Sequence, residues 1–387
     1  MNTGRLQRYP RQGPEPGNLL QRLLGMRAAL GITRVADITG LDRIGIPVMQ
    51  AVRPCSLSNA VSQGKGPTPE AAAIAAILEC AESCFAERLD RYESFVATPR
   101  SLGLAADAFA HHRWDPQHRG WQDKQLPWVP AHELLTGTHS AIPLELVHTA
   151  YVVPPAADGG VFMQTTTGLA AAFRKEDAAV HGILECVERD AVAKAMRTHG
   201  FFHHNRIDTA TIGDPGIMTL LERLREKDLI AALWRVPSPT GIPVVWCQLM
   251  ESHESSGTCL SFPADGSAAA LDPAAALYHA VLEAAQCRLA AISGARDDIT
   301  RAAYPKYPDH ARWQSHRKFL QNQTSVIDIR RLPHIETGVE GCRDALLERL
   351  RNCGINTVLA AEIDCAPLPE LSVVKTIIPA LQPLLEG

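Results

Sequence analysis

Three short acidic segments recur inside apolar stretches of this chain: ILECAES at residues 77–83, ILECVER at 183–189 and VLEAAQC at 281–287. Each has a branched aliphatic residue, Leu, Glu, two mostly small residues and then an acid or amide. The apolar spacing predicts a helix around each segment, over residues 68–89, 175–198 and 273–292. A buried carboxylate is costly unless it meets a cation or hydrogen-bond donors, so the fold has to supply such partners.

The first of these helices is unusually poor in charge. Between residues 67 and 86 only Glu70, Glu79 and Glu82 are charged, and Glu79 and Glu82 lie one turn apart beside the apolar stripe. A surface helix would carry several Lys and Arg on its outer face. We therefore expect little water on any side of this helix.

The other two segments repeat the spacing. The second helix offers Glu185 and Glu188, followed by Arg189, and the third offers Glu283 and Gln286, followed by Arg288. Oxygen atoms at i and i+3 from several helices suit a hard cation, and Mg²⁺ typically uses few carboxylates with phosphate oxygens and water. One interpretation is two magnesium ions holding a triphosphate.

In that interpretation Arg189, Arg288 and Arg296 neutralise phosphate. The alternative is that Glu and Arg pair with each other as buried salt bridges, which we would favour for a single segment. The threefold recurrence favours the metal–nucleotide interpretation. Because Gln286 replaces a Glu, the third helix is expected to supply less charge and one ligand fewer.

A Ser, Asn and Gly-rich stretch at residues 56–69 predicts a loop leading into the first helix. Its SQGKG lacks the spacing of a Walker motif. Glycines flanking Lys65 just before a helix can still bring backbone N–H groups and one ammonium to an anion. A simple tight turn explains the same residues equally well.

The composition excludes several classes of protein. The chain has 387 residues, a net charge of −4 and no basic field, which argues against nucleic acid or an anionic membrane as partner. The arginines before residue 12 indicate a solvated end. No apolar run reaches the length of a membrane helix and no signal-peptide core is present. The default compartment is the cytoplasm, which ten cysteines without regular disulfide spacing also fit.

The order of expected elements favours an α+β or mixed α/β fold. Residues 31–52 predict short strands broken by glycines, residues 142–155 contain a strand, and residues 229–250 alternate like a hairpin. Strands and helices interleave without a regular βαβ rhythm. Residues 301–323 are polar and basic and are expected to be exposed. No low-complexity linker marks a domain boundary.

Three long motifs resemble those of YcaO-domain proteins, in the same order. SQGKGPTPEAAAIAAILECAESCFAER resembles S-x-G-K-G, an Ala-rich helix and E-x-x-E, and TTTGLAAAFRKEDAAVHGILECVERDA resembles N-G-L-A-A-G-N…EA…H-x-x-x-E-x-x-E-R-D-A. HAVLEAAQCRLAAISGARDD resembles EA-x-Q-x-R…I-S-G-x-R-D-D. The N-terminal stretch at residues 31–54 is similar to the subgroup that works with a TfuA-like partner.

This resemblance implies a fold in which helices with acidic motifs pack on mixed, largely antiparallel sheets. It also implies an N-terminal segment over residues 1–58, a catalytic core over 59–370 and a tail over 371–387. YcaO proteins use ATP to phosphorylate a peptide-bond oxygen, which a nucleophile then replaces. A side chain of Cys, Ser or Thr gives an azoline, whereas external sulfide gives a thioamide.

The site residues carried over from the family fall into three groups. The implied magnesium ligands are Glu79, Glu82, Asp177, Glu185, Glu188 and Glu283. The implied ATP contacts are Ser62, Lys65, Arg189, Gln286, Arg288 and Arg296. Arg189 and Arg296 are also the expected catalytic residues, and the implied cofactors are ATP and Mg²⁺.

The chain departs from the family pattern at three places. Thr167 stands where the family often has Asn, and Ala172-Phe173 replaces Gly-Asn, so we expect a contact of an Asn amide to the nucleotide to be lost around Phe173. The C-terminus lacks the alternating prolines of many azoline-forming members and resembles the tails of TfuA-associated proteins. We therefore expect thioamide formation, with azoline formation and a non-catalytic scaffold as alternatives.

The expected partners are a peptide or protein substrate and a TfuA-like protein, without nucleic acid or membrane. A homodimer stays open.

Overall fold

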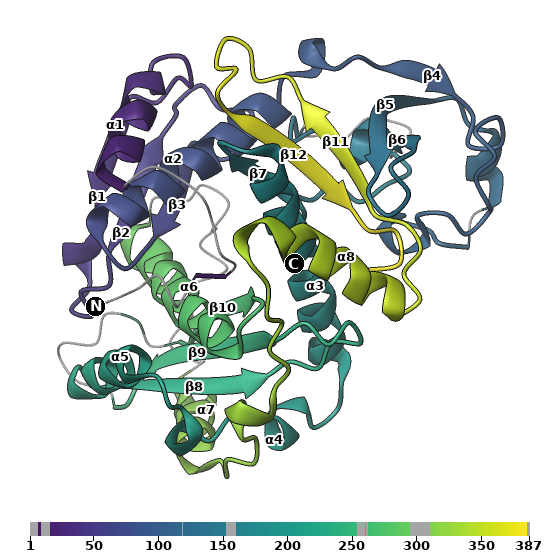
Figure 1. Cartoon of the computed structure of the whole chain (residues 1–387). Helices are drawn as coiled ribbons and strands as arrows, with labels where there is room; N and C mark the ends of the chain where they lie inside the picture. Colours follow the sequence, from purple (N-terminus) through teal and green to yellow (C-terminus); the bar gives the residue numbers. More distant parts are fainter. Residues whose placement is uncertain are drawn as a thin grey trace.

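The computed structural model describes residues 7–8, 16–117, 119–151, 160–253, 260, 262–294 and 310–384. Its named strands form three antiparallel sheets, and helices lie between and around them (Figure 1). This arrangement confirms the expected α+β class. No helix in the described ranges combines the length and the apolar character needed to cross a membrane.

The first sheet has the order β1-β2-β3. Its strands are β1 (Arg34–Asp37), β2 (Val48–Val52) and β3 (Val61–Lys65). Helix α2 (Pro69–Ala86) covers one face, and α1 (Pro16–Met26) packs on α2. The stretch at residues 56–69 is therefore not a continuous loop, because its centre is a strand.

The glycine of β3 explains this difference. A Cβ added at Gly64 would lie 2.1 Å from the backbone nitrogen of Ala76 and 2.2 Å from the carbonyl oxygen of Ala72. Gly64 thus permits the close approach of strand and helix, a role that turn-forming composition does not reveal.

The second sheet has the order β10-β9-β8. Its strands are β8 (Leu229–Arg235), β9 (Val244–Glu251) and β10 (Ala264–Ala269). Strands β8 and β9 form the hairpin that was expected from residues 229–250. Helix α6 (Pro273–Ser293) packs against β9 and β10, and α5 (Pro215–Glu226) packs against β8.

The third sheet has the order β4-β5-β11-β12-β7, with β6 paired to β5. Its strands are β4 (Phe95–Ala97), β5 (Leu126–Glu133), β6 (His139–Pro143), β7 (Leu169–Ala172), β11 (Leu359–Ile363) and β12 (Ser372–Ile377). Helix α3 (Lys175–Arg197) packs on β7 and β12. The remaining helices are α4 (Phe201–His204), α7 (His310–Asn322) and α8 (Cys342–Asn352).

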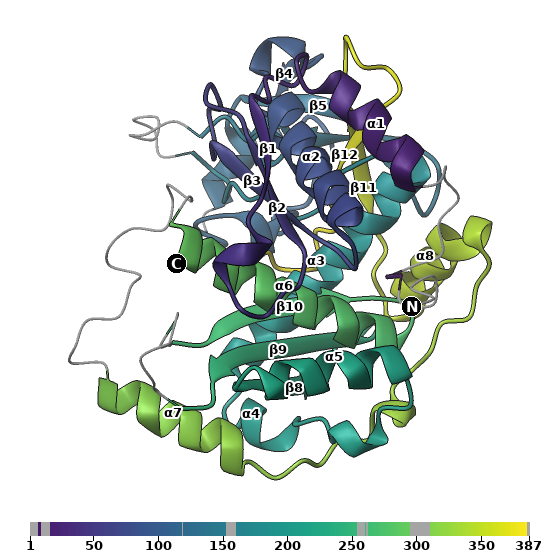
Figure 2. The same ribbon diagram turned by 90° about the vertical axis from the view of Figure 1, so that its left-hand side faces the viewer.

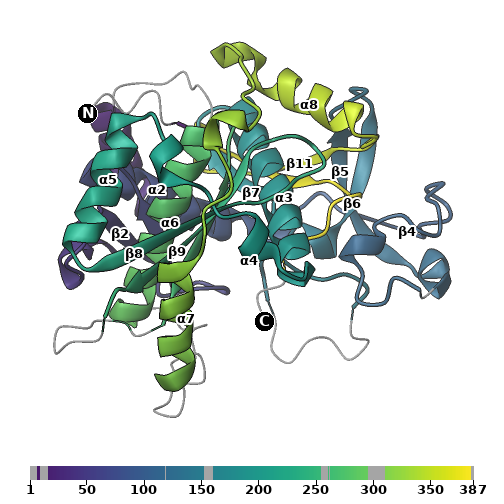
Figure 3. The ribbon, with the colours of Figure 1, turned by 90° about the horizontal axis from the view of Figure 1, so that it is seen from below.

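Each of the three helices with an acidic segment lies between two sheets. Helix α2 contacts β3 of the first sheet and β7 of the third (Figure 1). Helix α6 contacts β10 of the second sheet and β3 of the first (Figure 2). Helix α3 contacts β12 of the third sheet and β10 of the second. Helix α8 packs against α3 as well (Figure 3). This arrangement explains why these helices are apolar on several sides.

The predicted bounds of these helices are confirmed to within a few residues. Thr68 caps α2 by accepting from the backbone N–H of Ala71, Asp272 caps α6 in the same way, and Gly294 ends α6 in a left-handed conformation. The strand expected within residues 142–155 is present only to Pro143 and is wrong for residues 144–151, where a 3-10 turn follows β6; residues 152–155 lie outside the described residues. The predicted boundary between residues 58 and 59 lies in the connection between the paired strands β2 and β3. The predicted boundary between residues 370 and 371 lies just before β12.

Candidate nucleotide and metal site

Glu82 and Glu79 lie in the second half of α2. Glu82 is half-buried and accepts a hydrogen bond of 2.8 Å from the backbone N–H of Ala171 in β7, whereas Glu79 is exposed. Burial, followed by the charges on Glu79 and Glu185, raises the pKa of Glu82 well above its usual value. Three carboxylates from two helices are therefore close enough to repel one another.

Glu185 lies at the middle of α3 and faces β7. Its Oε2 accepts a hydrogen bond of 3.0 Å from the backbone N–H of Gly168, whose φ of +81° suits a glycine. Its Oε1 lies 3.6 Å from Nε of Arg189, one turn further along α3. Burial raises the pKa of Glu185 although the Arg189 charge opposes this effect. Glu185 thus already has one donor and one cation as partners.

Glu188 is buried, with 1% of its surface exposed. It accepts 2.9 Å and 3.0 Å hydrogen bonds from the Ser267 hydroxyl and the Ala269 N–H of β10. The guanidinium of Arg8 also contacts Glu188 directly. The N-terminal arginines were expected to form a solvated end, and for Arg8 that prediction is wrong because only 12% of its side chain is exposed.

Glu283 of α6 pairs with Lys65 of β3, with 2.9 Å between Oε2 and Nζ. Burial works against ionisation of Glu283, but the charges on Lys65, Arg189 and Arg8 outweigh it and lower the pKa to about 2. Lys65, Arg189 and Arg8 therefore converge from β3, α3 and the N-terminal segment on one carboxylate. Lys65, Arg189 and Glu283, which were predicted for the nucleotide site from separate parts of the sequence, therefore lie close together.

The resulting cluster is a mixed group of acids and cations. Its acids are Glu79, Glu82, Glu185, Glu188 and Glu283, and its cations are Lys65, Arg189 and Arg8. Within the described ranges, no three His, Cys, Asp or Glu side chains are gathered in a metal-binding arrangement. Magnesium needs few protein carboxylates when phosphate oxygens and water complete its shell. A magnesium ion at this place would offset the repulsion among the carboxylates around Glu82.

Three other predicted residues lie at the margin of this cluster or beyond it. Gln286 donates to the backbone carbonyl of Gln63, with 3.3 Å between the atoms, and so ties α6 to β3. Ser62 is buried on the α2 side of β3, close to the Cys80 thiol. Asp177 lies in the first turn of α3. Burial raises the pKa of the Cys342 thiol, and the charge on Asp177 raises it further.

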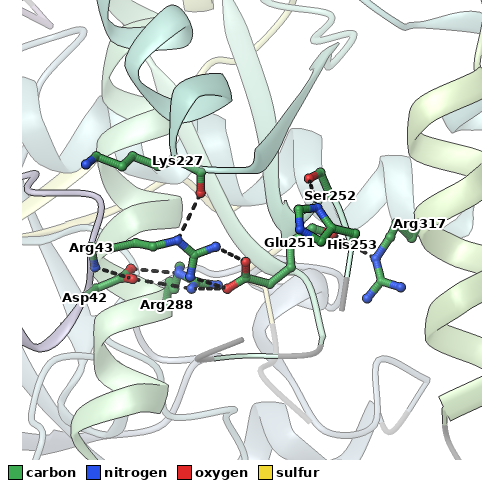
Figure 4. A network of polar contacts seen from close by, with 8 residues as sticks. All are labelled: Asp42, Arg43, Lys227, Glu251, Ser252, His253, Arg288 and Arg317. Carbon is green, nitrogen blue, oxygen red and sulfur yellow. Dashed lines mark hydrogen bonds and ion pairs between the residues drawn. The ribbon is translucent and has the colours of Figure 1, made fainter. Parts of the chain in front are cut away.

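Arg288 belongs to a different buried network (Figure 4). Its guanidinium bonds Asp42 at 2.7 Å and Glu251 at 2.6 Å, and it has no exposed surface. Arg43 contacts the same Glu251, and Arg317 donates to the Glu251 carbonyl oxygen. With two carboxylates on its guanidinium, Arg288 is not placed to neutralise phosphate. Arg296 lies outside the described residues.

The residues where the chain departs from the family pattern pack against the protein. Thr167 is buried beside Gly168. The guanidinium carbon of Arg22 in α1 lies over the Phe173 ring, 4.6 Å from the ring centroid. This cation–π contact accounts for an aromatic residue here.

Sequence reasoning missed Arg8 and also Lys375 of β12. Lys375 is 1% exposed and donates to the carbonyl oxygen of Thr165 at 2.6 Å. Burial lowers its pKa to about 8, although the charges of Cys186 and Glu185 act in the opposite direction. A lysine in the middle of the apolar run LSVVKTIIP was the available signal.

Comparison with known proteins agrees with this architecture. A family model described as YcaO cyclodehydratase, ATP- and Mg²⁺-binding, matches residues 63–382. A protein of Rhizobium leguminosarum bv. trifolii, described as an uncharacterized protein in the tfuA 3' region, is 30% identical over 92% of this chain and 85% of its own length.

Two solved structures share the fold. YcaO from Methanopyrus kandleri bound with AMPPCP and Mg²⁺ has a TM-score of 0.74 at 21% identity, over 97% of this chain and 93% of that one. A heterocyclase in complex with substrate and cofactor has a TM-score of 0.76 at 20% identity, over 98% of this chain and 55% of that one. Because the family model spans most of the sequence, the chain belongs to the YcaO family of ATP- and Mg²⁺-binding enzymes.

Proposed function

We propose that this protein uses ATP and Mg²⁺ to phosphorylate a backbone amide oxygen of a ribosomally made peptide or protein, and that sulfide then replaces this oxygen to give a thioamide. The observation that carries the proposal is the convergence of Glu82, Glu185 and Glu283 from three helices, with Lys65 and Arg189 between them. Carboxylates and cations in one place suit a metal-bound polyanion.

The basic residues are proposed to hold the triphosphate. Lys65 pairs with Glu283, and Arg8 pairs with Glu188. When a nucleotide binds, its phosphates replace these carboxylates as partners of Lys65, Arg8 and Arg189. The bound magnesium supplies charge neutralisation on the phosphates.

The acids are proposed to hold that magnesium. Glu82 and Glu185 are oriented by the N–H groups of Ala171 and Gly168, which fixes their oxygens before any ligand arrives. Glu79 lies on the exposed side of the same group and Glu283 on the α6 side. The share of the protein in catalysis is mainly positioning and neutralisation of charge.

The reaction balances as follows. The amide oxygen forms a bond to the γ-phosphorus while the bond from that phosphorus to the β,γ-bridging oxygen breaks, and ADP leaves. Hydrosulfide then adds to the amide carbon, the carbon–oxygen bond breaks, and phosphate departs with the former amide oxygen while the proton on sulfur is released to phosphate or water. Phosphorylation thus converts a poor leaving group into a good one.

One observation favours a thioamide over an azoline. A relative of this chain is described by its position in a tfuA 3' region. Azoline formation remains the second candidate, since the family description names cyclodehydratases. A non-catalytic scaffold is the third, kept open by Thr167 and Phe173.

An isotope experiment tests the proposal. A candidate substrate peptide, labelled with ¹⁸O at its backbone carbonyls, is incubated with the protein, a TfuA-like protein, ATP, Mg²⁺ and sulfide. We expect ¹⁸O in inorganic phosphate and a mass gain of about 14 units at the modified amide, where sulfur replaces ¹⁸O, whereas azoline formation loses about 20 units as H₂¹⁸O. ATP consumption with all ¹⁸O retained in the peptide would refute amide phosphorylation.

A further inference from the structure

Gly64 of β3 and Gly66, just after the end of this strand, face the same side of the first sheet. Both face α2, because a Cβ at either position would meet backbone atoms of that helix. Side chains alternate along a strand, so Gln63 and Lys65 face the opposite side, where Lys65 reaches Glu283 of α6. The Cα atoms of Gln63 and Lys65 are separated by about 6.6 Å, two residues of a strand.

The Gln63 side chain is buried without hydrogen bonds. It is 2% exposed, and neither Nε2 nor Oε1 has a hydrogen-bond partner among the described residues. Gln50, its register partner on β2, is 6% exposed, but its Nε2 donates to the Ser293 hydroxyl at 3.2 Å. A buried amide with neither group satisfied destabilises a protein unless a ligand supplies the partners.

The position of Gln63 ties this amide to the cluster of acids and cations. Its backbone carbonyl accepts from Gln286, one turn along α6 from Glu283. Lys65, two residues further on β3, bonds Glu283 itself. The unsatisfied amide therefore lies beside the residues proposed to hold the triphosphate, on the side of β3 that they share.

We propose that the Gln63 amide hydrogen-bonds the nucleoside part of bound ATP, an assignment that rests on the proposed function. An amide presents a donor and an acceptor together, whereas ionised phosphates only accept. The phosphates already have Lys65, Arg189 and Arg8 as cationic partners. The base and the ribose of a nucleoside offer both donors and acceptors, so they can satisfy both atoms of Gln63.

Gln63→Met tests this assignment, with Gln50→Met as the matched control. Methionine keeps the length of the side chain and removes the amide, so Gln63→Met should melt at the same or a higher temperature without ligand. It should weaken Mg²⁺·ATP binding about tenfold, the loss of one or two hydrogen bonds. Gln50→Met loses a satisfied amide, so it should melt lower and bind ATP within about twofold of wild type.

Calorimetric titration of inorganic triphosphate with Mg²⁺ separates the two parts of the nucleotide. We expect Gln63→Met to bind triphosphate like the wild type. Equal losses for ATP and triphosphate would overturn the nucleoside assignment, as would unchanged ATP affinity. If Gln63→Met does not fold, Gln63→Asn replaces it, because the shorter side chain withdraws the amide by one carbon. This variant must bind ATP more weakly than the wild type and bind triphosphate with unchanged affinity. A wild type that binds triphosphate and ATP with no Mg²⁺ dependence would refute the proposed function itself.

Discussion

The ion pair between Lys65 and Glu283 should contribute measurably to stability even without nucleotide. The pKa of Glu283 falls from 4.5 to about 2, and one pKa unit corresponds to about 1.4 kcal/mol, so its ionised form gains roughly 3 kcal/mol on folding. Lys65 is the largest of three favourable charges, and the two side chains are only 22% and 18% exposed. We therefore expect Lys65→Met to cost about 2 kcal/mol.

A double-mutant cycle of Lys65→Met and Glu283→Gln measures this contribution by urea unfolding at pH 7. We expect a coupling energy of about 1 to 2 kcal/mol. A lowered carboxyl pKa contributes stability above its usual pKa and loses it as pH falls, so the coupling should fade between pH 4.5 and 2. Lys175→Met is the control, because Lys175 and Glu362 are 44% and 49% exposed and should couple by less than about 1 kcal/mol. A coupling for Lys65 no larger than this control would refute the reasoning.

Three further outcomes follow from other parts of the structure. Burial lowers the pKa of His112 to about 4, so the free energy of unfolding of the wild type should fall by roughly 2 kcal/mol between pH 7.5 and 5. Urea unfolding of His112→Gln should show a smaller fall, and an equal dependence on pH in both proteins would contradict this prediction. Gly64→Ala should cost more than about 3 kcal/mol, because its Cβ would lie 2.1 Å from the Ala76 nitrogen, whereas Gly40→Ala has open space and should unfold like the wild type. Arg288→Met should lower the free energy of unfolding by about 3 to 5 kcal/mol, because Asp42 and Glu251 are left with less cationic charge. Unchanged stability together with lost ATP affinity would instead support the predicted role of Arg288 in neutralising phosphate.

The helices could be predicted because their signals are local. Thr68 and Asp272 accept hydrogen bonds from N–H groups within three residues, and the apolar spacing between cap and helix end is visible in the sequence. The strand β3 was not predicted, because Gly64 serves a contact with α2 and glycine otherwise marks turns. Arg8 was not predicted either, since its partner Glu188 is 180 residues away.

The acidic cluster itself was predicted in part from the repeated segments. The i, i+3 spacing correctly grouped Glu79 with Glu82, but it could not say which cation meets which acid. Arg288 follows Glu283 by five residues, which turns its side chain by about 140° around α6. Helical geometry therefore directs it to Asp42, a residue that the sequence pattern did not connect to α6.

In the proposed site, carboxylates from the three helices hold magnesium with ATP. Calorimetric titration of ATP into the wild type and Glu185→Gln, each with Mg²⁺ and with EDTA, tests it most directly. The variant keeps an oxygen to accept the Gly168 N–H, and Glu176→Gln in the first turn of the same helix is the control. We expect Mg²⁺-dependent ATP binding in the wild type and the control, and its loss in folded Glu185→Gln. Wild-type affinity in Glu185→Gln, with the same dependence on Mg²⁺, would contradict the account.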